Sequence, residues 1–184
     1  MTDSIALKTE LGDSLRERLR GKVLLVGIGN PMRGDDGVGP KIIDMLEGKV
    51  KAELLDAGEV PESYAGRMLA AQADTIVFLD AADFQAEPGD VAILGPDDLA
   101  GASVSTHQMP LNLLWNYLRE NTHADVFALG IQALQLGFGE PMSADVWSSA
   151  EYLEELLAQL LPKAVIRSPF LVSRSPLGTS SDNG

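Results

Sequence analysis

Four carboxylates and one imidazole lie at positions where side chains can carry out chemistry. Asp35 and Asp36 follow an apolar segment within a glycine-rich loop, and Asp56 and Asp80 each end a further apolar segment. His107 lies in a short loop of small polar residues. Two carboxylates and one histidine can bind a divalent metal ion without any thiolate. The same groups can activate a water molecule, with a carboxylate as the general base.

The segments that precede these residues have the pattern of buried strands. Apolar runs rich in Val, Ile and Leu predict strands at 22–28, 51–56, 75–81 and 125–131. A shorter strand is predicted at 91–94, after a turn at 87–90. Because that connection is too short for a helical crossover, we expect this strand to pair antiparallel with the strand at 75–81.

Helical patterns separate the predicted strands. Apolar residues at helical spacing predict helices that begin near Val38, Pro61, Pro110 and Ser143, and Pro162 ends the last of them. Strands that alternate with helices indicate a three-layer α/β/α fold, with a twisted, mainly parallel five-stranded sheet and one antiparallel strand.

Such a sheet brings its functional residues together at one edge. Ligands bind at the carboxyl ends of the strands, near the point where the strand order reverses. We therefore expect two or three of these carboxylates and the imidazole of His107 to converge on a single crevice. His107 would lie at the start of a helix, where the dipole disfavours imidazolium and leaves the neutral ring that a metal requires.

Each of these residues also has a structural interpretation. Asp35 or Asp36 can cap the helix that follows, since Asp is a favoured N-cap residue. Asp56 and Asp80 can hold turns. A single loop histidine such as His107 often has no ligand role. The sequence leaves open whether Asp35 or Asp56 joins the site.

The glycine-rich loop also raises the possibility of a nucleotide site. A dinucleotide fingerprint requires three glycines, but only Gly27 and Gly29 are present, and Met32 stands at the third position. Asp35 and Asp36 would direct negative charge at a pyrophosphate. The chain also has no phosphate-binding GxxxxGK[ST] loop and no GxSxG nucleophile motif. We interpret the glycines as turn residues around an acidic site.

The composition of the chain disfavours or excludes several kinds of partner and site. The 184 residues include 27 Asp and Glu against 14 Lys and Arg, which gives a formal net charge of −13. Nucleic acid and anionic membranes are therefore unfavourable partners. Without cysteine, disulfides, a thiolate metal site and a cysteine nucleophile are excluded. No secretory signal or membrane-spanning run is visible, so we expect a cytoplasmic protein. We also expect a monomer.

The length of the chain suits one domain with extensions at both ends. We expect a polar N-terminal arm at 1–21, a folded domain at 22–162 and a flexible C-terminal tail at 163–184, which is rich in Ser, Pro and Gly. For the arm, we favour a solvated extension over a short surface helix.

Four sequence blocks carry a resemblance to a known family. They are GIGNPMRGDDGVGP at 27–40, FLDAAD at 78–83, STHQMPLN at 105–112 and ALGIQ at 128–132. In this order the blocks resemble those of the nickel–iron hydrogenase maturation endopeptidases, and the resemblance spans about 22–161. It implies the same twisted five-stranded sheet between helices.

The resemblance also implies roles for three residues. Asp36 and Asp80 match the family's metal-contacting carboxylates, and His107 matches its ligand histidine. These residues are expected to contact nickel that the substrate supplies, and the family has no resident catalytic zinc. The expected reaction is hydrolysis that removes a C-terminal peptide from the nickel-loaded precursor of a hydrogenase large subunit. Whether a carboxylate activates the attacking water, and which one, is left open.

One alternative function and one departure from the family remain. The same ligands would suit a non-hydrolytic maturation factor, resembling a metallochaperone, that recognises the nickel site without cutting. The family usually has proline where Ala133 stands, in a loop that bears on the choice of substrate.

Overall fold

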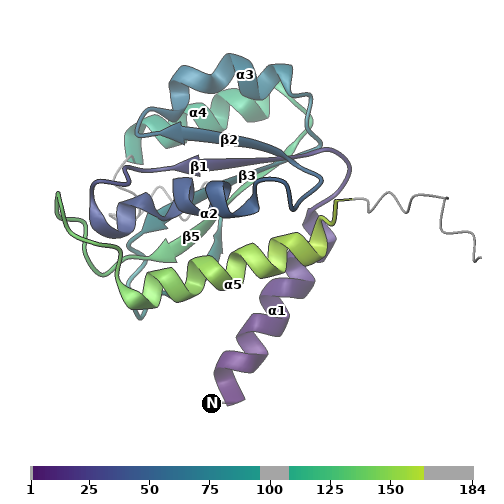
Figure 1. Cartoon of the computed structure of the whole chain (residues 1–184). Coiled ribbons are helices and arrows are strands. Elements are labelled where there is room, and N and C mark those ends of the chain that lie inside the picture. Colours follow the sequence, from purple (N-terminus) through teal and green to yellow (C-terminus); the bar gives the residue numbers. More distant parts are fainter. Residues whose placement is uncertain (1, 96–107, 164–184) are drawn as a thin grey trace, which may run out of the picture.

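The computed structural model describes residues 2–95 and 108–163, in which a five-stranded sheet lies between two helical layers (Figure 1). The strand order is β2-β1-β3-β5-β4. All neighbouring strands are parallel except β4 and β5. The strands are β1 (Val23–Ile28), β2 (Glu53–Gly58), β3 (Thr75–Ala82), β4 (Val91–Leu94) and β5 (Asp125–Gln132). This is the predicted α/β architecture.

Helices cover both faces of the sheet. Helices α2 and α5 cover one face and α3 and α4 the other (Figure 1). The α-helices are α1 (Thr2–Arg18), α2 (Val38–Leu46), α3 (Ala65–Ala70), α4 (Gln108–Asn121) and α5 (Ala144–Leu160). Two short 3₁₀ helices, η1 (Gly34–Gly37) and η2 (Pro61–Tyr64), lead into α2 and α3.

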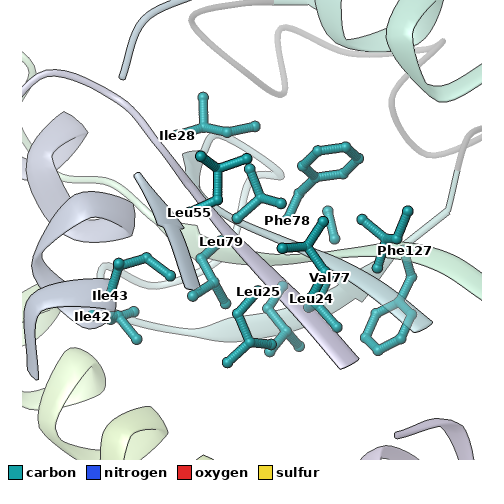
Figure 2. Packing of buried hydrophobic residues seen from close by; sticks show 14 of the residues in the cluster. Leu24, Leu25, Ile28, Ile42, Ile43, Leu55, Val77, Phe78, Leu79 and Phe127 are labelled. Atoms are coloured by element: carbon teal, nitrogen blue, oxygen red, sulfur yellow. The ribbon is translucent and has the colours of Figure 1, made fainter. Parts of the chain in front are cut away.

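The central strands form the core because they are covered on both faces. Every residue of β1 and β3 is buried. Figure 2 shows Ile42 and Ile43 of α2 on the same side of the sheet as Leu79. On the other face, the ring of Phe78 lies 6.0 Å from that of Trp115 in α4. The continuous apolar runs of the sequence are explained by this two-sided burial.

The predicted partner of the strand at 91–94 was wrong. Strand β4 pairs antiparallel with β5, through Val91 with Ile131 and Leu94 with Ala128. Both edges of β3 are already occupied, by β1 and β5. Strand β4 therefore lies at the outer edge of β5, the strand next to β3.

The favoured interpretation of the N-terminal arm, a solvated extension, was also wrong. Helix α1 spans most of the arm, and its Leu15 is completely buried. The guanidinium of Arg18 donates to both carboxylate oxygens of Asp125, at 2.8 and 2.6 Å, and lies 3.9 Å from the ring centre of Phe127. The arm is thus fastened to the amino-terminal end of β5.

The predicted C-terminal tail at 163–184 lies outside the described residues, apart from residue 163. Among the described helices, none combines the length and apolarity that crossing a membrane requires.

Candidate functional site

The loop after β1 turns sharply and places Asp36 beside the end of that strand. Gly29 has a φ of 128°, and a Cβ at this position would lie only 1.7 Å from the carbonyl oxygen of Asp36. Only glycine permits this approach of one backbone segment to another. The Asp36 side chain is 1% exposed, and its Oδ2 accepts a hydrogen bond from the Asn30 backbone N–H at 2.9 Å.

Asp80 lies near the carboxyl end of β3, the strand next to β1. It is 3% exposed and pairs in register with Gly130 of β5. Side chains alternate along a strand, so Asp80 faces the same side as Phe78, towards the layer that contains α4. In the pairing of β3 with β1, Leu79 is in register with Gly27, so Asp80 lies level with Ile28, the last residue of β1.

Asp36 and Asp80 therefore lie at the carboxyl ends of adjacent parallel strands. Both side chains are almost completely removed from solvent. Buried carboxylates are costly in free energy unless hydrogen bonds or cations compensate them. Two of them at one edge favour the approach of a divalent cation, for which carboxylate oxygen is a suitable ligand.

His107 lies outside the described residues, so the structure gives no position for its side chain. The described chain resumes at Gln108, where α4 begins. Helix α4 packs against η2, which follows the carboxyl end of β2, and then leads into the first residue of β5. The helix thus runs from the edge that holds Asp36 and Asp80 towards the opposite edge.

Asp35 has a structural role. Its carboxylate is completely buried and accepts four hydrogen bonds. Oδ2 accepts from the backbone N–H groups of Leu134 and Gln135, at 2.8 and 3.0 Å, and from Oγ of Ser143, at 3.1 Å. Oδ1 accepts from the backbone N–H of Ser143 at 2.6 Å. Asp35 thus joins the loop after β1 to the loop after β5, at the start of α5.

Asp56 holds a turn at the end of β2. Its side chain is exposed, and Oδ1 accepts a hydrogen bond from the backbone N–H of Gly58 at 3.0 Å. Asp56 pairs in register with Gly27, on the side of β1 away from β3. The strand β1 therefore separates it from Asp80.

Gln132 positions the segment that follows Asp80, a role that residue type alone did not reveal. Its Oε1 accepts hydrogen bonds from the backbone N–H groups of Phe84 and Ala86, at 2.9 and 3.2 Å. Its Nε2 donates to Oδ1 of Asp83 at 3.3 Å. The only signal in the sequence was its place at the end of the ALGIQ block.

The two buried carboxylates do not complete a metal site by themselves. Within residues 2–95 and 108–163, no group of three or more Asp, Glu or His side chains is arranged to hold a metal ion. A cation at Asp36 and Asp80 would therefore need ligands from elsewhere, such as His107 or a bound partner.

Comparisons with known proteins agree on one family. Residues 40–160 match the model of the family described as hydrogenase maturation protease. The hydrogenase 3 maturation protease of Escherichia coli is 33% identical over 137 residues, which cover 73% of this chain and 87% of that protein.

Solved structures show the same similarity. The nickel–iron hydrogenase maturation protease HycI of Thermococcus kodakarensis is similar with a TM-score of 0.74 and 36% identity, over 80% of this chain and 98% of that one. The endopeptidase HycI of Escherichia coli gives a TM-score of 0.69 and 28% identity, over 80% and 99% of the two chains.

Proposed function

This chain belongs to the hydrogenase maturation protease family, and on that premise we propose that it removes a C-terminal peptide from the nickel-loaded precursor of a nickel–iron hydrogenase large subunit. The chain is a hydrogenase maturation endopeptidase. The observation that carries the proposal of a nickel-loaded substrate is the pair of buried carboxylates, Asp36 and Asp80, at the ends of adjacent strands.

In this proposal Asp36, Asp80 and His107 contact the nickel ion that the precursor already holds. The ion belongs to the substrate, so the protease supplies only part of its coordination. Carboxylate oxygens and a neutral imidazole suit such an ion. The two buried carboxylates at the strand edge support this proposal.

The chemical step in this proposal is hydrolysis of one peptide bond. A water oxygen attacks the carbonyl carbon of the scissile bond, and the C–N bond breaks. One proton of the water passes to the departing amine, by way of a carboxylate that acts as general base. Asp36 and Asp80 are the candidates for that base, and the nickel ion fixes the precursor's C-terminal segment beside them.

Further features of the proposal follow from the sequence. The partner is the large-subunit precursor, and the net charge of −13 disfavours nucleic acid and anionic membranes. We propose that the protein acts in the cytoplasm as a monomer. We also propose that residues 22–162 form the peptidase domain.

The proposed function is tested by the intact mass of candidate precursors after incubation with the protein. A nickel-loaded precursor should lose the mass of a C-terminal peptide, and the same precursor without nickel should keep its full mass. Cleavage of both forms would contradict nickel recognition. Stable binding of the loaded form without any loss of mass would instead support the non-hydrolytic maturation factor.

A further inference from the structure

Exposed apolar side chains gather at the edge of the sheet that carries Asp36 and Asp80. Among the described residues, eight large apolar side chains are strongly exposed, and five of them follow a strand or begin α5 at this edge. These five are Met32, Val60, Leu134, Phe138 and Trp147. Apolar side chains that are exposed close together can form a surface that binds another protein.

One of these side chains, Trp147, lines a pocket, and Met32 and Phe138 belong to the two loops that form part of its walls. The pocket has a volume of about 440 Å³ and lies between the loop after β1, the first turns of α2 and α5, and the loop after β5. Its walls are largely apolar and include Pro31, Pro141, Met142 and Trp147. Met32 (58% exposed) adjoins Pro31, and its carbonyl oxygen accepts from the Gly139 N–H beside Phe138 (77% exposed). We call this pocket with Met32, Phe138 and Trp147 the docking face.

The docking face is held rigidly before any partner binds. The backbone N–H of Gly34 donates to Glu140 O at 3.1 Å, and that of Gly139 donates to Met32 O at 2.7 Å. The buried carboxylate of Asp35 joins the same two loops and the start of α5. Because the loops are already ordered, binding there loses little conformational entropy.

The docking face shares the 3₁₀ helix η1 with the candidate active site. Gly34 and Gly37 line the pocket, and Asp36, which lies between them in the chain, contributes to the site. A polypeptide that reaches Asp36 from the side of the sheet covered by α2 and α5 would pass this pocket. This shared helix favours the substrate itself as the occupant.

The charges around the pocket define the chemistry of the occupant. The amine of Lys41 is held by Oδ2 of Asp44 at 3.0 Å and lies 5.5 Å from the ring centre of Trp147. Asp56 and Glu140 add two further carboxylates to the lining. An acidic side chain would be repelled, and the apolar walls suit a large apolar side chain.

We propose that the docking face anchors the hydrogenase large-subunit precursor by a large apolar side chain that neutral or basic residues flank. This inference rests on the proposed function, because the precursor is the proposed substrate. Aromatic side chains in such anchors often dominate the binding free energy, and those around them exclude water. The docking face would hold the precursor while its nickel ion engages Asp36 and Asp80.

The test is single-turnover cleavage of the nickel-loaded precursor that the wild-type protein cleaves, with the protease in excess and its concentration varied. Phe138→Ser and Trp147→Ala should each raise the half-saturating protease concentration by about tenfold or more. Tyr117→Ser removes an aromatic side chain of similar exposure (44%) from the second half of α4, away from this edge, and should leave that concentration unchanged. Melting temperatures verify that all three variants are folded.

The outcomes separate this inference from the proposed function. If the wild-type protein cleaves no nickel-loaded precursor, the proposed function fails, and the inference falls with it. If it cleaves and both variants keep the wild-type half-saturating concentration, only the docking face is refuted. A lower plateau rate at unchanged half-saturation would also refute it. The docking face would also be refuted if the variants lost a self-association that wild type shows in sedimentation while their half-saturating concentration stayed unchanged. In that case a second copy of the chain would be the occupant.

Discussion

Replacement of Asp35 by alanine should destabilise the fold strongly, although the neighbouring Asp36 is the residue proposed for function. The Asp35 carboxylate is completely buried and accepts four hydrogen bonds from Leu134, Gln135 and Ser143. The alanine variant leaves these donors without their acceptor. It also releases the loop after β5 from the loop after β1.

The magnitude follows from the burial of the donors. Each hydrogen bond to a charged acceptor contributes about 1.5–3 kcal/mol, less where water can replace the acceptor. Both donors of Ser143 are buried, whereas those of Leu134 and Gln135 are only partly buried. Removal of the carboxylate also abolishes the cost of burying it, so we expect a net loss of about 3–5 kcal/mol.

The assay is urea denaturation together with a thermal melt of Asp35→Ala. For a chain of this size, the expected loss corresponds to a fall in melting temperature of roughly 6–20 °C. Asp90→Ala is the matched control. Its exposed carboxylate accepts one hydrogen bond, from the Glu87 N–H at 3.1 Å, and should contribute less than about 1 kcal/mol. Equal melting temperatures for the two variants would refute the assigned role of Asp35.

Two further predictions concern how the elements that position the site are packed. Gly39→Ala should lower the free energy of unfolding by about 2–3 kcal/mol, because the added Cβ would lie 2.2 Å from Leu79 O. Gly66→Ala, in α3, should raise it by up to about 1 kcal/mol, because no atom lies within 4 Å of the added Cβ. Urea denaturation that shows the same sign of change for both variants would contradict this packing. Arg18→Ala should lower the free energy of unfolding by about 1–2 kcal/mol, because it removes two hydrogen bonds to Asp125 and the contact with the Phe127 ring. A melting temperature unchanged from wild type would show that Arg18 does not fasten α1.

The central strands could be predicted because strands buried on both faces consist almost entirely of apolar residues. Strands β1 and β3 are covered on both faces, and the sequence shows this as continuous Val, Ile and Leu runs. Once the sheet was taken as mainly parallel, the positions of Asp36 and Asp80 at its carboxyl edge followed from chain order.

Other features depend on contacts that local sequence does not record. The partner of β4 was missed because it depends on which sheet edges the remaining strands leave free. Helix α1 was missed because its docking uses Asp125 and Phe127, more than a hundred residues away. Residue type and position alone did not reveal the structural role of Asp35, since the donors that hold it lie about a hundred residues further along the chain.

The central claim is that Asp36 and Asp80 act on a precursor that carries its own nickel. The most direct test is the single-turnover cleavage rate of the nickel-loaded precursor by wild type, Asp36→Asn, Asp80→Asn and the control Glu47→Gln, an exposed carboxylate just after α2. We predict that each Asn variant is folded and loses at least about a hundredfold in rate, as general-base loss alone costs roughly 10²–10⁴, while Glu47→Gln keeps the wild-type rate. Asn variants that cleave as fast as Glu47→Gln would contradict the claim.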